Sequence, residues 1–522
     1  MSDGPRAREQ DSLRLPSATM PTRRPSTTLA ACWALAAACA VACGPQAAET
    51  GEAPGPDAQG GSPARPNLVL ISLDNLGARH LGCYGYERET SPFLDSLAEQ
   101  GVLFEQAISA DTWTLPSHVS LLSSRPVGAH GVWQIESRLP VEARLVQEVL
   151  QDGGYHTAAF TSCLFVSELY GFGRGFDHLR TEHTSADKLK PLIETHLDGL
   201  GDEPFFLFLH YYDVHQPFDE PNPYGQDFTE GIAADAVDAA ERMAALAGRP
   251  AESLTAEEIS WLVEAFPEHD VRERIAASAA RGDILGDWVL RFVYRYLVQQ
   301  GPEAMRSMQA SYDNGVANMD KHLADLFQSL RERPWFEDTI FVITSDHGEA
   351  FNEHPGHIGH GGPPYQDQAH VPLIVLGRDI PGGRRVGATV GGVDVAPTLL
   401  DLAGLPTPDE FQGRSLSPAF SGSIPERPTL SGARVTGRVA AVDGAWKLMH
   451  RGEDARTVEL LSIPEGESRD HATSQPDRMR RLTDWLGRSE QRNADAVSSL
   501  SSTEMELDEE TTARLRELGY IR

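Results

Sequence analysis

Two short stretches of the sequence place carboxylate and imidazole side chains directly after apolar runs. Asp74 follows NLVLISL, and Asp346-His347 follows TIFVITS. Divalent cations bind carboxylate oxygen and imidazole nitrogen when these groups are held on rigid supports. Asp74, Asp346 and His347 are therefore candidate ligands of one metal ion. Helix capping by each aspartate is the alternative, and it accounts better for one isolated Asp than for two Asp residues beside a His.

The pattern of apolar runs predicts the elements that hold these side chains. Short, β-branched-rich runs are typical of buried parallel strands, and amphipathic segments such as Tyr312–Leu330 are typical of helices. The expected strands are Asn67–Leu73, Phe205–His210, Thr339–Ser345 and Val371–Leu376. This alternation predicts an α/β fold with a mostly parallel central sheet flanked by helices. Ligands of such folds bind at the carboxyl ends of the strands, where Asp74, His210 and Asp346 stand.

The N-terminal segment has the features of an export signal followed by a spacer. The apolar stretch Leu29–Cys43 follows Arg23 and Arg24 and is shorter than the ~20 residues that span a bilayer. It resembles a bacterial lipoprotein signal over residues 1–43, with Cys43 as the acylated residue. Ordinary cleavage without a lipid is the alternative. Residues 44–66 are rich in Pro, Gly and Ala and are expected to be a flexible linker. The protein is therefore expected outside the cytoplasm, anchored to a membrane.

The rest of the chain divides into a large and a small part. Residues 67–421 are expected to form the catalytic domain, with a helical insertion at about 221–308, and residues 422–522 a smaller C-terminal α+β subdomain. With 45 Lys and Arg against 76 Asp and Glu, the formal net charge is −31, which disfavours nucleic acid as a partner. Five cysteines exclude a disulfide scaffold.

Several blocks in fixed order resemble the sulfatase family of the alkaline-phosphatase superfamily. They are PNLVLISLDNLGARHLGCYGY, TWTLPSHVSLLSS, SDHGEAFNEH with GHGG and HVPLIVLG, and VDVAPTLLDLAGLP with GRSL. The resemblance runs from Asn67 to about Leu416 and implies a metal-dependent hydrolase of ester bonds. Asn75 stands where many sulfatases have a second metal-binding Asp, so the resemblance adds it to the candidate ligands.

The nucleophile position departs from the family pattern. Sulfatases have Cys or Ser there, which is oxidised to formylglycine, followed by Pro, Ser and Arg. Here the matching stretch is Thr114-Leu115-Pro116-Ser117-His118, and threonine cannot form that aldehyde. Thr114 resembles instead the threonine nucleophile of lipoteichoic acid synthases and nucleotide pyrophosphatases, and it is expected to bind the metal as well. The alternative is that Thr114 only caps a helix beginning at Pro116.

Four histidines are candidate substrate-binding residues. His215 and His360 match family histidines near the ester oxygens, and either could bind the anion or protonate the leaving group. His118 replaces the motif arginine. His130 matches a position that is often polar, with a place on the surface or behind the site as its default role.

These residues predict an exported, metal-dependent hydrolase of sulfuric or phosphate-type esters. One divalent ion is expected, with Ca, Mn and Zn equally suitable, and the substrate is a small anionic ester or a sulfated or phosphorylated glycan or lipid. Two alternatives stay open. One is a transferase that passes a phospho-headgroup to a surface lipid or glycan, and the other is a non-catalytic binding protein on the same fold.

Overall fold

The computed structural model describes most of the chain from residue 65 to residue 505. Within that range it leaves out 202, 217, 219, 226–227, 233–245, 247–252, 266–271, 274, 277–297, 300, 434–437, 451–457 and 502–503, and beyond it describes 507–508, 511–512 and 515. The predicted signal, Cys43, nearly all of the linker and most of the predicted insertion lie outside these residues. None of the described helices is long and apolar enough to cross a membrane.

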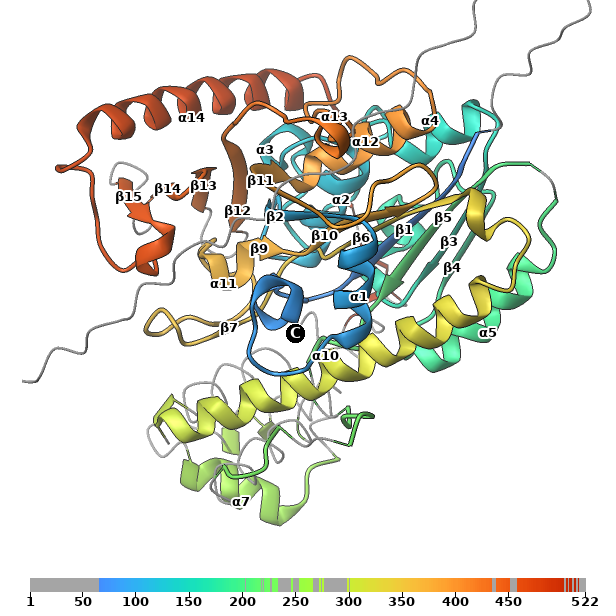
Figure 1. Cartoon of the computed structure of the whole chain (residues 1–522). Coiled ribbons are helices and arrows are strands. Elements are labelled where there is room, and N and C mark those ends of the chain that lie inside the picture. The colour runs from blue at the N-terminus through green and yellow to red at the C-terminus, as the bar shows by residue number, and fades with distance from the viewer. Residues whose placement is uncertain are drawn as a thin grey trace, which may run out of the picture. The chain divides into compact units, whose positions relative to one another are not determined.

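A nine-stranded, mostly parallel sheet lies at the centre of the fold (Figure 1). Its order is β11-β2-β10-β6-β1-β5-β3-β4, with β9 paired to β2. The strands are β1 (Asn67–Leu73), β2 (Val102–Ile108), β3 (His156–Thr161), β4 (His178–Thr181), β5 (Phe205–Tyr211), β6 (Thr339–Thr344), β9 (His370–Val371), β10 (Leu373–Gly377) and β11 (Arg384–Gly391). β1 pairs in parallel with both β5 and β6, and Ser72 lies level with His210 and Thr344. The three strands therefore end at the same edge.

The run Val371–Leu376 differs from the prediction of one parallel strand. Pro372 divides it into β9 and β10, because proline has no backbone N–H to give to a ladder. β10 is antiparallel to both β6 and β2. An apolar run shows that a strand is buried, but it carries no information about the strand's direction.

Helices cover both faces of the sheet, as predicted. Leu68 and Leu70 of β1 contribute to one core and Val69, Ile71 and Leu73 to the other, so successive side chains enter opposite layers. The core that contains Leu68 and Leu70 includes α2 (Thr114–Ser123), α4 (Val146–Asp152) and α12 (Val395–Leu402). The core that contains Val69, Ile71 and Leu73 includes α1 (Pro92–Gln100), α5 (Ala186–Leu197) and α10 (Pro302–Leu330).

The helix predicted over Tyr312–Leu330 begins earlier, at Pro302, because proline suits the first helical turn and Ala304, Met305 and Met308 extend the buried face.

A four-stranded antiparallel sheet and a long helix form the C-terminal subdomain. The sheet order is β12-β13-β14-β15, and α14 packs Leu482 and Leu486 against it. The elements are β12 (Thr429–Ala433), β13 (Arg438–Asp443), β14 (Trp446–His450), β15 (Val458–Ser462) and α14 (Pro476–Val497). This is the small α+β subdomain that the sequence predicts. Shorter elements are α3 (Val127–His130), α7 (Ala256–Ala265), β7 (Ala350–Phe351), β8 (Ile358–Gly359), α11 (Gln366–Ala369) and α13 (Pro418–Ser421).

Candidate metal and catalytic site

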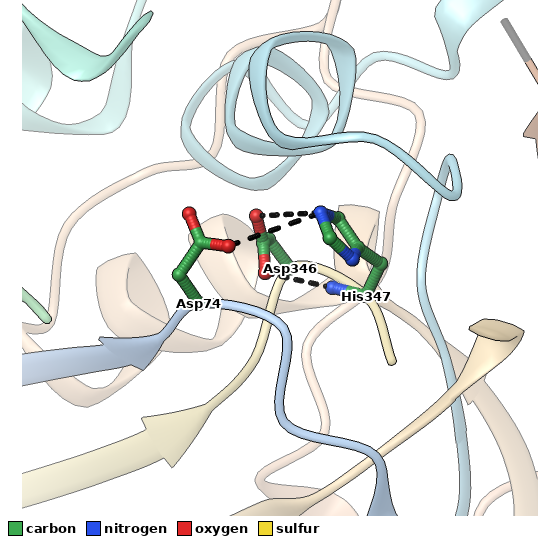
Figure 2. Close-up of side chains that lie close together, drawn as sticks. All are labelled: Asp74, Asp346 and His347. Atoms are coloured by element: carbon green, nitrogen blue, oxygen red, sulfur yellow. Dashed lines mark hydrogen bonds and ion pairs between the residues drawn. The ribbon is translucent and has the colours of Figure 1, made fainter. Parts of the chain in front are cut away.

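Asp74, Asp346 and His347 meet at the carboxyl edge of the central sheet, where β1 and β6 end side by side (Figure 2). His347 Nε2 lies 3.4 Å from Asp346 Oδ2 and 3.9 Å from Asp74 Oδ1. All three side chains are buried, and one ligand atom of each lies within 4.8 Å of the others. The structure thus brings together the three residues that the sequence proposes as metal ligands.

The backbone after Asp74 turns sharply at Asn75. Asn75 has a φ of 66°, in the left-handed region that Asn tolerates better than most residues. This turn directs the Asn75 N–H to Asp346 Oδ1 at 3.0 Å, and the His347 N–H donates to the same oxygen at 2.8 Å. Both polar atoms of the Asn75 side chain are buried without a hydrogen-bond partner. The Asn75 amide oxygen is therefore still available to a ligand.

Thr114 is the first residue of α2 and faces the same point. Its Oγ1 lies 3.3 Å from His347 Nε2. His347 Nδ1 donates to the carbonyl of Gly348 at 3.1 Å, so Nε2 carries the lone pair. The N-cap position belongs to Trp113, and no side chain caps this helix. The interpretation of Thr114 as the cap of a helix beginning at Pro116 is therefore wrong.

The donor atoms fit a divalent cation. Asp74 Oδ1 and Asp346 Oδ2 are buried and have no hydrogen-bond partner, and in the described part of the chain both carboxylates pair only with histidines. His347 Nε2 lies 3.3–3.9 Å from oxygens of Thr114, Asp346 and Asp74. Such separations are typical of neighbouring ligands on one ion with bonds of roughly 2.0–2.3 Å. Two buried carboxylates without a cationic partner are costly, and a bound cation removes that cost.

The two carboxylates have opposite pKa shifts. Burial raises the pKa of Asp74 well above its ordinary value, and the negative charges of Asp346 and Glu349 raise it further. Burial also acts to raise the pKa of Asp346, but the neighbouring His347, His118 and His210 lower it to about 2. Asp346 is therefore readily ionised, whereas ionisation of the neighbouring Asp74 is disfavoured. This is the electrostatic pattern of a site that lacks a positive charge.

His118 supports Thr114 and Asp346 instead of facing the substrate. Its Nδ1 donates to the Thr114 carbonyl at 2.9 Å, and its Nε2 accepts from the Ser72 hydroxyl at 2.9 Å. The ring is fully buried, which lowers its pKa, and Nδ1 lies 3.6 Å from Asp346 Oδ2. Both ring nitrogens are occupied within the protein, so the structure does not support the predicted contact with substrate.

His130 is a buried structural residue. The Val132 N–H donates to Nδ1 at 3.0 Å, so Nε2 carries the proton and donates to Ser120 Oγ at 3.0 Å. Burial lowers the pKa of His130 to about 3, which keeps it neutral. The predicted substrate contact of His130 has no support in this geometry. Of the two default expectations, a surface position is wrong, whereas a buried place behind α2 agrees with the contact to Ser120.

His215 and His360 extend the site through a row of rings. The His360 ring stacks on His347 with centroids 4.7 Å apart, and His215 meets His360 edge-on at 4.9 Å. His360 Nδ1 lies 2.8 Å from Glu349 Oε2. His215 Nδ1 donates to the Gln216 carbonyl and its Nε2 accepts from the Tyr212 hydroxyl, both at 3.0 Å. Both residues therefore lie near the candidate metal ligands, and their roles at the ester oxygens stay predictions.

Two buried residues of the site were not among the predicted ones. His210 accepts from the Ser162 N–H at Nδ1 and directs Nε2 to Asp74 Oδ2 at 3.1 Å, which orients that carboxylate. Glu349 is fully buried and orients His360. Signals for both were present, since His210 ends a predicted strand and Glu349 lies in the SDHGE block. Neither signal names a partner: the contact of His210 joins distant parts of the chain, and that of Glu349 depends on the fold of the loop that carries His360.

Comparison with known proteins identifies the family. A sequence profile described as Sulfatase matches residues 66–405, which is well over half of the chain. The chain belongs to the sulfatase family.

Two similar proteins are named for the hydrolysis of sulfated glucosamine. N-acetylglucosamine-6-O-sulfatase of Bacteroides thetaiotaomicron is 24% identical over 68% of this chain and 71% of its own length. The human N-sulphoglucosamine sulphohydrolase is 24% identical over 68% of this chain and 66% of its own length. The chain thus spans about two thirds of the length of these curated relatives.

Solved structures show the same fold. A structure described as a complex with its substrate D-glucosamine-2-N,6-O-disulfate has a TM-score of 0.61 and 19% identity, and covers 83% of this chain and 99% of that one. The phosphonate monoester hydrolase of Silicibacter pomeroyi has a TM-score of 0.60 and 18% identity, with 85% and 98% covered. One fold therefore includes a protein solved with a sulfated sugar as its substrate and an enzyme named for phosphonate monoesters.

Proposed function

We propose that this protein is a metal-dependent hydrolase of sulfuric or phosphate-type esters that uses Thr114 as its nucleophile. The observation that carries the proposal is the position of the Thr114 hydroxyl. It lies at the first residue of α2 and faces His347 Nε2, beside two carboxylate oxygens that lack hydrogen bonds. A non-catalytic relative would have no need to keep a hydroxyl, two carboxylates and an imidazole around one point.

Asp74, Asp346, His347 and Thr114 would hold one divalent ion, with the Asn75 amide oxygen as a further candidate ligand. The ion supplies positive charge that lowers the pKa of a hydroxyl and offsets the charge that develops on the ester oxygens. Thr114 releases its hydroxyl proton to water and its Oγ attacks the sulfur or phosphorus. The bond to the ester oxygen breaks as that oxygen takes up a proton. Water then hydrolyses the threonyl ester, which releases sulfate or phosphate and restores the hydroxyl.

His360 is the better placed of the two histidines to protonate the leaving oxygen. Glu349 holds its Nδ1 at 2.8 Å, which orients the ring and stabilises the protonated form. In neutral His215, Nδ1 donates to Gln216 and Nε2 accepts from Tyr212, so neither nitrogen has a proton to offer. Burial lowers the pKa of His215 well below its ordinary value. We assign His215 to orienting the substrate instead.

A sulfated glycan is the substrate class that the relatives favour. Two relatives are named for sulfated glucosamine, and one solved neighbour carries a glucosamine disulfate. The threonine argues for phosphate-type esters, because a threonyl sulfate cannot eliminate its sulfate as formylglycine can. A panel of aryl sulfate, phosphate monoester, phosphate diester and phosphonate substrates, each assayed with Ca²⁺, Mn²⁺ and Zn²⁺, separates the two classes.

Three variants at Thr114 test the nucleophile. Thr114→Val is nearly isosteric but lacks Oγ, so turnover should fall by several orders of magnitude while the protein still folds. Thr114→Ser keeps the oxygen and should retain measurable turnover. Mass spectrometry of the enzyme quenched during turnover should show the added sulfuryl or phosphoryl group on the peptide that contains Thr114. Near-normal turnover of Thr114→Val would show that another group performs the attack.

Thr114→Cys should not gain sulfatase activity through formylglycine as the single variant. His118 occupies the position of the motif arginine, so the maturation machinery lacks its sequence signal. His118→Arg would supply that signal, but it also removes the hydrogen bonds to Thr114 and Ser72 from a fully buried position. The double variant should therefore be assayed for folding before activity.

We further propose that the enzyme is exported and tethered to a membrane through an acylated Cys43. The support is the sequence alone: an apolar stretch that ends in Cys43-Gly44, followed by a Pro/Gly/Ala-rich spacer. The protein should partition with membranes, and Cys43→Ser should block its processing or release it. Recovery of the unaltered protein wholly in the soluble fraction outside the cytoplasm would contradict the anchor.

A further inference from the structure

Three histidines gather at the edge of the central sheet opposite to the candidate catalytic site. His156 begins β3 and His178 begins β4, whereas the catalytic residues follow the ends of β1 and β6. His196 lies in the last turn of α5, which packs on this part of the sheet (Figure 1). Because β3 runs parallel to the strand next to β1, the beginning of β3 lies far from the carboxyl edge.

The register of the strands explains why the three rings meet. His178 lies level with Ala158, and His156 precedes Ala158 by two residues, so both histidines point to the same face of the sheet. Ala158 belongs to the core that α5 covers, together with Ile193 and Leu197 of that helix. The same face therefore directs both strand histidines toward His196.

The distances match a pair of metal ligands. His156 Nε2 lies 3.4 Å from His196 Nε2, where the two rings share a hydrogen bond that a bound ion would replace. Two imidazole nitrogens bound to one tetrahedral ion at 2.0–2.1 Å are separated by about 3.3–3.4 Å. The His178 ring stacks on the His196 ring with centroids 4.8 Å apart. His178 can serve as the third ligand only if its side chain rotates when the ion binds. The three side chains are partly exposed, which leaves water free to complete the coordination.

Asp177 prepares His156 for this role. Its Oδ2 lies 3.4 Å from His156 Nδ1 and is fixed by the N–H and hydroxyl of Thr157. A carboxylate on one ring nitrogen keeps the proton there and leaves the other nitrogen as the ligand, which is the usual support of a metal-binding histidine. The position of His196 at the end of α5 also favours a cation, because the last carbonyl groups of a helix carry partial negative charge.

We propose that His156, His178 and His196 form a second metal site, specific for a borderline transition-metal ion such as Zn²⁺, Ni²⁺ or Cu²⁺. Imidazole ligands suit these ions, whereas Ca²⁺ and Mg²⁺ prefer oxygen. The ion joins α5 to β3 and to β4, which is the last strand of the sheet. The site is structural, and it is independent of the reaction proposed for Thr114.

Zinc counting on the full exported chain tests the site. The protein is stripped with a chelator, dialysed against Zn²⁺ and analysed for bound zinc. His196→Gln should hold one zinc equivalent fewer than the unaltered protein and keep its ester hydrolysis. Asp346→Ala should also hold one fewer, but by losing the other ion. His322→Gln is the matched control, because His322 is a half-buried histidine of α10 outside the cluster, and it should bind the full amount.

Affinity and stability give a second readout. Asp177→Asn should weaken zinc binding at this site by about 10–100-fold, as loss of a carboxylate support usually does. Added Zn²⁺ should raise the Tm of Asp346→Ala, in which only the histidine site remains, and Ca²⁺ should not. The proposal is overturned if His196→Gln and the unaltered protein bind equal amounts of zinc, or if Zn²⁺ leaves the Tm of Asp346→Ala unchanged while raising that of His196→Gln.

Discussion

Two buried charge clusters in this protein are balanced in different ways. At the sheet edge, Asp74, Asp346 and Glu349 are buried with histidines as their only ion-pair partners in the described chain. In the C-terminal subdomain, the buried Lys447 pairs with Glu467 at 2.6 Å and donates to the Pro364 carbonyl. The second cluster contains its own cation, and the first does not. This difference distinguishes a carboxylate that stabilises the fold from the carboxylates of the proposed metal site.

The Lys447 cluster also serves the active site indirectly. Glu467 Oε2 accepts from the backbone N–H of Gln366, the first residue of α11. The carbonyl of Gln368 in the same helix accepts from the N–H of Gly348, directly after His347. The Lys447–Glu467 ion pair therefore holds α11 in place, and α11 in turn supports the backbone that follows the candidate ligand His347. It is a means of positioning and needs no ligand of its own.

Isosteric removal of one charge should reduce the metal content in the first cluster and leave it unchanged in the second. Asp346→Asn should lower turnover by several orders of magnitude and reduce bound metal, because it removes a charged ligand from the candidate site. Glu467→Gln removes a carboxylate charge of similar burial but should leave the metal content unchanged. Metal analysis and turnover of both variants, after circular dichroism has shown that they fold, make the comparison. Full metal occupancy in Asp346→Asn would defeat the proposed ligand set.

Of the two partners of the Lys447–Glu467 pair, replacing the lysine should lower the free energy of unfolding more than replacing the glutamate. Lys447→Met leaves Glu467 as a buried charge without a cation, which costs about 3–5 kcal/mol when a buried pair is broken. Adding Glu467→Gln to Lys447→Met should recover part of that loss, because the unpaired charge is then gone. Chemical denaturation of the single and double variants measures both. If Lys447→Met is as stable as the unaltered protein, the pair contributes nothing to holding α11 in place.

The sequence predicted the parts of the site that follow directly from strand ends. Asp74 and Asp346-His347 come after apolar runs, and ligands of such folds bind at the carboxyl ends of the strands, so a shared site could be expected. That β1 and β6 are direct neighbours could not. The roles of His118 and His130 could not be predicted in this way. His118 lies one helical turn after Thr114, and whether its ring faces substrate or the protein depends on Ser72 and Asp346, which are distant in sequence.

Pairings across long separations account for the remaining differences. The direction of β10, the contact of His210 with Asp74 and the Lys447–Glu467 pair are each fixed by how distant segments pack. Local periodicity reports burial and element type only. The departure at Thr114, in contrast, was visible in the sequence, because it rests on residue identity at a motif position.

The metal-free site should show a distinct pH dependence of stability. The folded pKa of Asp74 is raised above its ordinary value of 3.8, so the folded protein keeps this proton at pH values where the unfolded chain has released it. Stability of the metal-free protein should therefore fall as the pH rises above about 4, where the unfolded chain has released this proton. Asp346, with a pKa lowered to about 2, contributes stability that is lost only as the pH falls below about 4.

Asp74→Asn isolates this contribution. The variant lacks the carboxyl group. In the metal-free state, the Tm of the variant minus the Tm of the unaltered protein should therefore increase as the pH rises from about 4 to about 7. All other titrating groups are shared, and the difference between the two curves reports Asp74. Parallel curves would show that the Asp74 carboxylate is already balanced without a metal ion.

The smallest effect is expected at His210, which touches Asp74 but is not itself a proposed ligand. Its Nδ1 accepts from Ser162, so Nε2 carries the proton and holds Asp74 Oδ2, leaving Oδ1 directed toward His347. His210→Met removes this donor while filling similar volume and should weaken metal binding about 10–100-fold. His210→Gln keeps an N–H donor near the Nε2 position and should recover much of that affinity.

His130→Met is the matched control, since His130 is equally buried and hydrogen-bonded but bonds to Ser120 and Val132. It should lower the Tm without changing the metal affinity. Equal metal affinity in His210→Met and His130→Met would mean that His210 only fills space, and that the orientation of Asp74 is set by the backbone turn at Asn75.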